Sequence, residues 1–351
     1  MTKPFRPDQL DRLPPTWRAS VIDGLPDAID AVAAAAPTAH RFLRRQWYAA
    51  ALAAYGGVAR TVVVGSEAGP GIALPLVASG PRWLGAASVP GCYWPFRGFP
   101  AATDDPGAWA ALVDALAGTV TALRVGPVFA DDPGLALLVA AARRRGWTAL
   151  PRFLAERFVL DLAAEGWPRG STLRKNRFHE KHLAAHGALE WSLAEGCEVA
   201  AQEAMSAVER ASWIVTRTDG SDAKFTAEGH GAFWRAAVRD PVLAAMFRVA
   251  LLRVDHEPVA FSFDIAAGPV RYAIANSYDP RFAKHSPGKL LQYRNLVAAA
   301  ADGTRTVDWG AGDVGYKQTI GAVRGGDIQD WLLLRPGWPA RLGGLLRRWW
   351  R

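Results

Sequence analysis

The chain has 351 residues, half of them hydrophobic, and a formal net charge of +8. This length exceeds the usual size of a single domain, so we expect two packed cores and no extensive disorder. Its apolar runs are far shorter than the roughly 20 residues that cross a bilayer, which excludes a spanning helix. The first ten residues carry charges and prolines instead of the apolar stretch of a secretory signal, so we expect a cytoplasmic protein.

The cysteine content and the charge limit the kinds of site and partner. Cys92 and Cys197 are the only cysteines, which excludes a disulfide framework and a four-cysteine zinc site. The positive charge favours an anionic partner, and nucleic acid, an anionic membrane face and a phosphorylated cofactor all satisfy it. Charge alone does not choose among these three.

The first half of the chain is predicted to form an α/β unit. Residues 1–37 are rich in proline and alanine and show little periodicity, so we expect a loosely packed N-terminal lead-in. A first domain over 38–150 is predicted to contain helices at 41–55, 106–118 and 133–146 and strands at 60–65, 71–77, 121–125 and 147–150. Between them, residues 90–100 combine proline, glycine and aromatics, which predicts an ordered loop; we expect Tyr93 and Trp94 in it to line a substrate pocket.

The second half is predicted to form a separate domain over 151–335. Its expected strands are 156–162, 189–193, 247–254, 259–266, 270–276, 305–309 and 328–334, and its expected helices are 171–185, 198–212, 227–239 and 287–301. The tail, 336–351, mixes arginine with tryptophan and leucine. This composition indicates either an interfacial helix on an anionic membrane or simple packing of the tail onto the protein.

One strand of the second half leads through a polar loop into a helix that starts Ser286-Pro287-Gly288-Lys289. Proline at the start of a helix costs no hydrogen bond, and glycine lets a ligand approach the backbone closely. The free amides of Gly288, Lys289 and Leu290 would then face an anion, helped by the positive charge of Lys284, His285 and Lys289. The sequence therefore predicts a diphosphate site, with an ordinary helix start and solvated lysines as the alternative.

Other side chains are candidates for the acceptor side of a site. Arg174, Lys175, Asn176 and Arg177 fall within one turn of the predicted helix, which indicates either an anion clamp or a solvated face. Trp213 follows another helix and either borders an acceptor pocket or packs in the core. The histidines at 179, 182 and 186 have metal-like spacing, but no acidic residue completes the set, so we expect no metal site.

Several segments resemble the GNAT acetyltransferase domain of CelD-like proteins, which are relatives of the Fem-type peptidyltransferases. The similar segments of the second half are STLRKNRFHEKHL, SYDPRFAKHSPG and WGAGDVGYK, and IALPLVASG and GCYWPF are similar to a degenerate first domain. The resemblance covers most of residues 40–335. It implies an α/β fold of the mixed α+β type, with two tandem GNAT-like domains of which the first is degenerate.

The resemblance also implies where an acyl donor binds. Acyl-CoA would be a cosubstrate of the second domain, with no cofactor held permanently. The strand over 272–276, including Ala275 and Asn276, would pair with the pantetheine arm. The cradle for the diphosphate would comprise His285, Ser286, Gly288, Lys289 and Leu290. Because the loop lacks the usual Arg/Gln-x-x-Gly-x-Gly/Ala pattern, aminoacyl-tRNA stays open as a Fem-type donor.

Acyl transfer to an amine needs a proton acceptor for the amine, a donor to the carbonyl and a proton for the leaving thiolate. Asp313 follows a strand in a glycine-rich turn, and Tyr278 follows the strand expected to bind pantetheine. Together with Lys317 they are the predicted catalytic residues. Asp279 beside Tyr278 is a candidate orienting group. The alternatives are a helix cap for Asp313, a turn-forming role for Asp279 and a solvated helix position for Lys317.

The resemblance implies an acyltransferase that moves an acyl group from acyl-CoA to an amine or hydroxyl of an envelope, lipid or polysaccharide precursor. No hydrolase elbow, Walker loop or Rossmann fingerprint is evident. We expect no nucleic-acid partner and a cytoplasmic location, with the tail as a candidate for peripheral contact with the inner membrane face. The alternatives are a Fem-type aminoacyl-tRNA-dependent transferase and a non-catalytic GNAT-like scaffold that binds nucleic acid or another anionic polymer.

Overall fold

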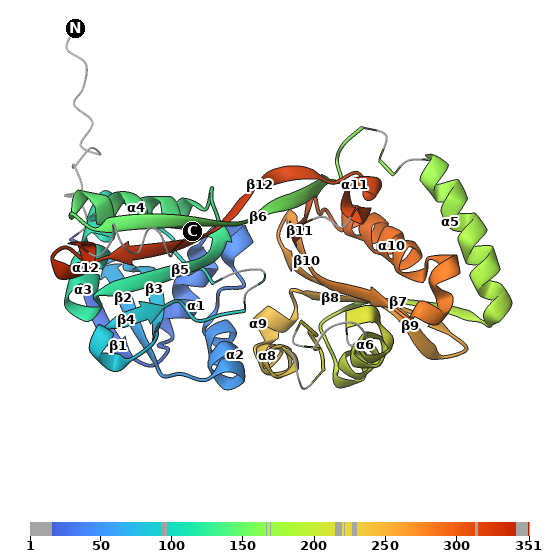
Figure 1. Ribbon diagram of the computed structural model, residues 1–351, viewed down its shortest axis with the longest axis horizontal. Helices are drawn as coiled ribbons and strands as arrows, with labels where there is room; N and C mark the ends of the chain where they lie inside the picture. The colour runs from blue at the N-terminus through green and yellow to red at the C-terminus, as the bar shows by residue number, and fades with distance from the viewer. Residues whose placement is uncertain are drawn as a thin grey trace, which may run out of the picture.

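The computed structural model describes residues 16–350 except 93, 95–96, 166, 169, 215–219, 221, 227–229, 313–314 and 342–349. Within these residues the strands form one 12-stranded sheet in the order β1-β2-β3-β4-β5-β12-β6-β11-β10-β9-β8-β7. Figure 1 shows two lobes, and the long strands β6 and β12 run from one lobe to the other. The mixed sheet with helices confirms the expected fold class.

The elements of the two halves follow each other in a similar order. The strands of the first half are β1 (Arg18–Asp23), β2 (Ala59–Ser66), β3 (Gly69–Ala78), β4 (Ala86–Ser88), β5 (Ala122–Phe129) and β6 (Thr148–Asp161). Its α-helices are α1 (Ala28–Ala35), α2 (Arg45–Tyr55), α3 (Pro106–Thr119) and α4 (Pro133–Arg144). The β2–β3 hairpin and α2–α4 lie where the sequence predicts them.

The second half contributes the other strands and helices. Its strands are β7 (Leu189–Glu195), β8 (Phe247–Val254), β9 (Glu257–Ala267), β10 (Val270–Tyr278), β11 (Thr306–Ala311) and β12 (Val323–Leu334). Its α-helices are α5 (Gly170–Leu183), α6 (Val199–Ala211), α8 (Gly231–Ala237), α9 (Pro241–Ala244), α10 (Pro287–Ala301), α11 (Tyr316–Ile320) and α12 (Trp338–Arg341). Helix α10 contacts β9 on one face of the sheet and α6 contacts it on the other (Figure 1), which explains why β9 is apolar along most of its length.

Each half orders its first five strands in the same way, and the sixth strands are exchanged. Strands β1 to β4 and β7 to β10 are antiparallel neighbours, and the pairs β4–β5 and β10–β11 are parallel. The last strand of the second half, β12, then pairs with β5, while β6 of the first half pairs with β11. Because β6 and β12 also pair with each other, the sheet continues through the junction between the halves.

Two expectations about the first half are corrected. Residues 18–35, expected within a loosely packed lead-in, form β1 and α1, and α1 fully buries Ile29, Val32 and Ala33. The break expected near residue 151 is absent, because Pro151 stays in register opposite Trp331 inside β6. The two strands predicted at 147–150 and 156–162 are therefore parts of one strand that crosses the expected boundary.

The cores of the two halves also merge. The largest hydrophobic cluster includes Trp47 of α2 and Phe233 of α8, whose rings meet edge to face with centroids 4.7 Å apart. Two smaller clusters lie mainly in the second half, and one of them includes Phe158 and Leu160 of β6. The expected pair of separate cores is thus replaced by one shared core with two satellites. A shared aromatic core fixes the halves relative to each other more firmly than a polar domain contact would.

The contacts of the C-terminal end and the lengths of the helices are relevant to whether the protein contacts a membrane. The Trp350 indole donates a hydrogen bond to the carbonyl oxygen of Leu150 at 3.1 Å, and the Arg152 guanidinium lies 4.4 Å from the Trp350 ring centroid. The end of the tail therefore packs onto the protein. Among the described residues, no helix has the length and apolar character needed to cross a membrane.

Candidate functional site

The parallel strands β10 and β11 part soon after they pair. Their register covers three residue pairs, from Val270 opposite Thr306 to Tyr272 opposite Asp308. Beyond these pairs, β10 has an irregularity between Ala273 and Ala275 in its pairing with β9, and β11 shifts its register against β6. Bulges bend strands and end pairing, so the two strands diverge toward their C-terminal ends. The divergence leaves the β11-facing edge of β10, including Ala275 and Asn276, without a strand partner among the described residues.

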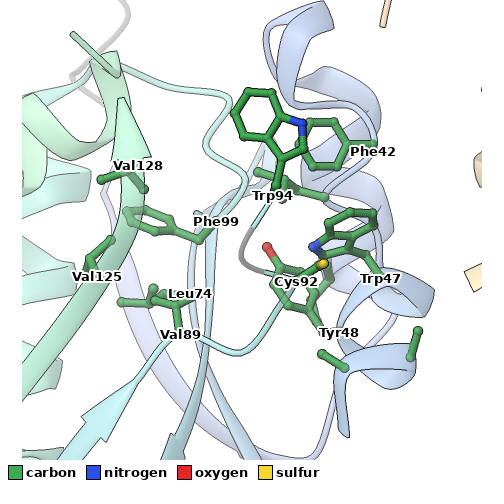
Figure 2. Packing of buried hydrophobic residues seen from close by; sticks show 14 of the residues in the cluster. Phe42, Trp47, Tyr48, Leu74, Val89, Cys92, Trp94, Phe99, Val125 and Val128 are labelled. Atoms are coloured by element: carbon green, nitrogen blue, oxygen red, sulfur yellow. The ribbon is translucent and has the colours of Figure 1, made fainter. Parts of the chain in front are cut away.

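Trp94 of the first half lies where the strands diverge. Its indole nitrogen donates a hydrogen bond to the carbonyl oxygen of Ala273 on β10 at 3.0 Å. On β11, Gly310 has a left-handed φ of 66°, and a Cβ atom there would lie 2.9 Å from the Trp94 ring. Trp94 is only 6% exposed and packs among the aromatic side chains of the first half (Figure 2). Trp94, which was predicted to line a substrate pocket, contacts both β10 and β11 in the structure. Tyr93, the other residue predicted there, lies outside the described residues.

The 3-10 helix η4 (Pro280–His285) connects β10 to α10, and α10 has no side-chain cap. The residue before it, Ser286, adopts a left-handed conformation with φ 52° and ψ 48°. Pro287 has no NH group, and the backbone NH groups of Gly288 and Lys289 have no acceptor among the described residues. The NH group of Leu290 donates to the carbonyl oxygen of Ser286 at 3.0 Å, so the prediction of a third free amide is wrong. Two amides therefore face outward at a helix N-terminus, where an anion is favoured.

The side chains around the start of α10 differ in how much positive charge they contribute. Tyr278, at the end of β10, covers Gly288 so closely that a Cβ atom there would lie 3.0 Å from Cδ1 of the ring. His285 shares a 2.9 Å hydrogen bond between its Nε2 and Nε2 of His186. Desolvation and nearby positive charge lower the pKa of His285, so this side chain adds little charge at neutral pH. The positive charge at the cradle therefore comes from Lys289 and from the exposed Lys284.

Asp308 is an acidic residue that sequence reasoning missed. It is 3% exposed and sits at the last pair before β10 and β11 diverge. Desolvation raises the pKa of Asp308 to about 6, against the opposing effects of a 2.9 Å hydrogen bond from the Gly310 NH and the charges of Arg157 and Lys317. Arg157 Nη1 lies 3.8 Å from its carboxylate. An aspartate within an otherwise apolar strand is the signal that points to it.

The predicted catalytic residues have different surroundings. Lys317 is 5% exposed, and its ammonium donates to the carbonyl oxygens of Trp309 at 2.8 Å and Ala311 at 2.9 Å, which holds the end of β11. Tyr278 stands over the start of α10, and Asp313 lies outside the described residues. The three are therefore not brought together around one reacting atom by the part of the chain that is described.

The predicted acceptor residues are also dispersed. Helix α5 contacts α10 and the 3-10 helix before it, with Arg174 and Arg177 exposed and Asn176 buried. Trp213 is 54% exposed beyond the end of α6. A cavity of about 390 Å³ lies in the first half beside the start of α4 and includes none of the predicted site residues. In the described ranges, no three histidine, cysteine or acidic side chains are grouped for a metal ion.

Comparisons with known proteins agree with the fold. Residues 169–318 match the family described as acetyltransferase (GNAT) domain. Similar solved structures include FemX (14% identity, 91% of this chain and 97% of that chain, TM-score 0.59). A conserved protein of unknown function from Bacteroides thetaiotaomicron is also similar (12% identity, 90% and 100%, TM-score 0.55). So is the C-terminal domain assigned to a lysylphosphatidylglycerol synthetase from Agrobacterium fabrum (16% identity, 91% and 93%, TM-score 0.54). At these identities the likeness concerns the fold, and no curated protein matches the sequence.

Proposed function

Because the chain carries a GNAT domain over residues 169–318, we propose that it transfers an acyl group from acyl-CoA to an amine or hydroxyl. One observation carries the proposal: β10 and β11 part after three residue pairs, next to a helix start without a side-chain cap. The open edge of β10 at Ala275 and Asn276 would accept the pantetheine arm. The amides of Gly288 and Lys289 would accept the diphosphate.

The proposed orientation of acyl-CoA along β10 suggests a role for each neighbouring side chain. With the diphosphate at the end of β10, Tyr278 lies at the phosphate end, so we reassign it from catalysis to donor binding. The thioester would then lie toward the point of divergence, near Asp308. In the proposed reaction the acceptor nitrogen bonds to the thioester carbon, the carbon–sulfur bond breaks, Asp308 takes the proton of the amine, and solvent protonates the thiolate. Lys317 acts as a positioning residue that holds β11.

The pKa of about 6 supports Asp308 in this role, because the group is ionised at neutral pH and still basic enough to accept a proton. The catalytic role of Asp313 stays a prediction. Acceptors of the proposed reaction are precursors of envelope, lipid or polysaccharide, and the proposed place of action is the cytoplasm, at the inner membrane face where the acceptor is lipid-linked.

A second candidate donor is aminoacyl-tRNA. The observation that favours it is the exposed row of Arg174, Lys175 and Arg177 on α5, which contacts α10, together with a fold similar to that of FemX. A polyanionic donor would contact several phosphates at once. Its affinity would fall steeply with added salt, whereas acyl-CoA binding at two amides would fall much less.

The decisive experiment measures release of free coenzyme A thiol from acyl-CoAs of increasing chain length, with amine and hydroxyl acceptors. A matched pair of variants accompanies it. Gly288→Val places a branched side chain against Tyr278 and across the cradle, and we expect it to reduce donor affinity more than 100-fold. Gly118→Val is the control, because nothing lies within 4 Å of a Cβ atom at that helix position. Equal donor affinity in both variants, or no turnover and no thermal shift with any donor, would remove the proposal.

A further inference from the structure

Two aromatic side chains from different halves meet beside the donor site. The Tyr55 hydroxyl, at the end of α2, lies 2.6 Å from Nδ1 of His230, the residue before α8. The two rings cross at 74° with centroids 5.8 Å apart. Tyr55 is 44% exposed, so the pair is open to solvent on one side. Beneath it, Cys92 Sγ lies 4.0 Å from the Tyr55 hydroxyl.

The surroundings of this pair are rich in positive charge. Desolvation, together with the positive charges of Lys224 and Arg97, lowers the pKa of His230 to about 4, and the charge of Asp222 opposes this shift. The same two cations favour the thiolate of Cys92, although desolvation outweighs them and raises the pKa of that thiol. His230 is therefore neutral at pH 7.

The two cations are held in place by the protein. Lys224 is 7% exposed, and its backbone NH donates to the buried Glu209 carboxylate at 2.7 Å. The NH of Phe225 donates to the second oxygen of Glu209 at 2.8 Å, which fixes this segment. The Arg97 Nε is buried and has no hydrogen-bond acceptor among the described residues. The Lys224 ammonium donates to the carbonyl oxygen of Asp222 at 2.8 Å, and the charges of Lys224 and Arg97 both act on His230. A guanidinium and an ammonium near one point favour a carboxylate or phosphate.

The chain itself connects this pair to the donor site. Cys92 is two residues before Trp94, so their Cα atoms are at most about 7 Å apart. Trp94 bonds to Ala273 and packs on Gly310, where β10 and β11 diverge. A molecule bound at Tyr55 and His230 would thus lie close to the end of the divergence at which the thioester is proposed.

We infer that the Tyr55–His230 junction is the acceptor site, and that it takes an acceptor carrying an anionic group, which Arg97 and Lys224 hold. The acceptor's amine or hydroxyl would face the divergence of β10 and β11. The anion site stands on its own residues, while its role as acceptor site rests on the proposed acyl transfer.

Histidine NMR on the full chain tests both parts separately, with the His230 resonance identified by its loss in His230→Gln. Inorganic phosphate and acetate are the two probes, which distinguish the two sources of negative charge. We expect at least one of them to shift the His230 resonance saturably and to raise its pKa, because the anion offsets Lys224 and Arg97. Arg97→Gln and Lys224→Met should each weaken this response at least tenfold; Arg97→Gln, which replaces a partly exposed side chain, keeps the test valid if the second variant does not fold.

The donor site has its own reporter in the same spectra. Coenzyme A should shift His285, next to the cradle, and leave His230 unchanged. If neither anion moves His230 while coenzyme A moves His285, the acceptor site is refuted and the donor site stands. If the anions move His230 equally in wild type and in Arg97→Gln, the assigned cations are wrong. If coenzyme A leaves His285 unchanged while the anions act on His230, the proposed acyl transfer falls and the anion site remains.

Discussion

Helices α3 and α10 occupy the same place in the two halves, each between the two parallel strands, and they begin with similar tripeptides. Helix α3 begins at the proline of Asp105-Pro106-Gly107, and α10 begins at the proline of Ser286-Pro287-Gly288. The Asp105 carboxylate accepts the Gly107 NH at 2.7 Å, and the nearby Trp17 indole and the Gly107 NH lower its pKa. Ser286 makes no such cap. The first half therefore has its own anion at the helix start, whereas the second half leaves that place open.

The parallel strands differ at the matching position as well. The last pair of β4 and β5 is Ser88 opposite Arg124, and the last pair of β10 and β11 is Tyr272 opposite Asp308. Arg124 is neutralised by the fully buried Asp330 at 2.6 Å. The ion pair that Asp308 makes with Arg157 is longer, at 3.8 Å, and the charge of Lys317 also favours the ionised Asp308. The same arrangement of two parallel strands and a helix therefore has a structural role in the first half and forms a candidate site in the second. The difference lies in the charged residues at the point where each strand pair ends.

The largest expected effect tests the connection between the halves. Trp94→Ala removes the hydrogen bond to Ala273 and leaves a cavity beside Gly310, and we expect it to lower the free energy of unfolding by about 3–5 kcal/mol. Urea denaturation measures the change. The control is Trp83→Ala, whose side chain is 80% exposed and whose removal should be nearly neutral. Similar losses in the two variants would show that Trp94 does not hold β10 and β11.

The next effect concerns the charge at the divergence. The pKa of Asp308 in the folded protein, about 6, is above its ordinary value of 3.8, so its stabilising contribution is complete below about pH 3.8 and is lost as the pH rises through 6. At pH 7.5 the buried charge opposes folding. Asp308→Asn should therefore raise the free energy of unfolding there by up to about 3 kcal/mol, and the gain should vanish near pH 4.

Denaturation of wild type and Asp308→Asn across this pH range gives the stability difference, and thiol release gives the activity. If Asp308 accepts the proton, the wild-type rate should rise through about pH 6 and this step should disappear in the variant. A variant that is stabilised yet keeps the full rate and pH profile would leave Asp308 with a structural role alone.

A substitution at the start of α10 tests whether the charge at the helix start causes the difference between the two halves. Ser286→Asp gives α10 the anion that α3 has, and repulsion of the diphosphate should weaken coenzyme A binding about 10- to 100-fold. Ser286→Asn has a similar shape without the charge and also tolerates the left-handed backbone. Titration calorimetry should show near wild-type affinity for Ser286→Asn, and equal losses in both variants would contradict an electrostatic cause.

The smallest effect is expected in the first half. Asp105→Ala uncaps α3 and should lower Tm by about 2–4 °C. Donor affinity should not change. Within its described residues the first half has no open strand edge like that of β10, and no lysine follows the Pro-Gly pair of α3 as Lys289 follows that of α10. A thermal scan with and without coenzyme A measures both quantities. If coenzyme A bound at a second site in Asp105→Ala, the Asp105 cap alone would explain why α3 does not bind the donor in the wild type.

Local patterns were sufficient for many elements of this protein. The apolar and β-branched runs predicted the β2–β3 hairpin and β8–β10, and the Ser-Pro-Gly-Lys sequence predicted the start of α10 and two of its three expected free amides, because these features depend on bonds between residues near in sequence. The resemblance to GNAT domains, carried by ordered segments, identified the fold class that the comparisons confirm.

Contacts between distant residues decided the rest. Trp94 bonds to Ala273 across 179 positions, and Tyr55 meets His230 across 175. The exchange of β6 and β12 and the burial of Asp308 likewise depend on which strands lie together, and periodicity carries no information on that choice. A side chain's pKa and role follow from its burial and charged neighbours, so only the tertiary structure distinguished Asp308 and His230 from the other polar residues of the chain.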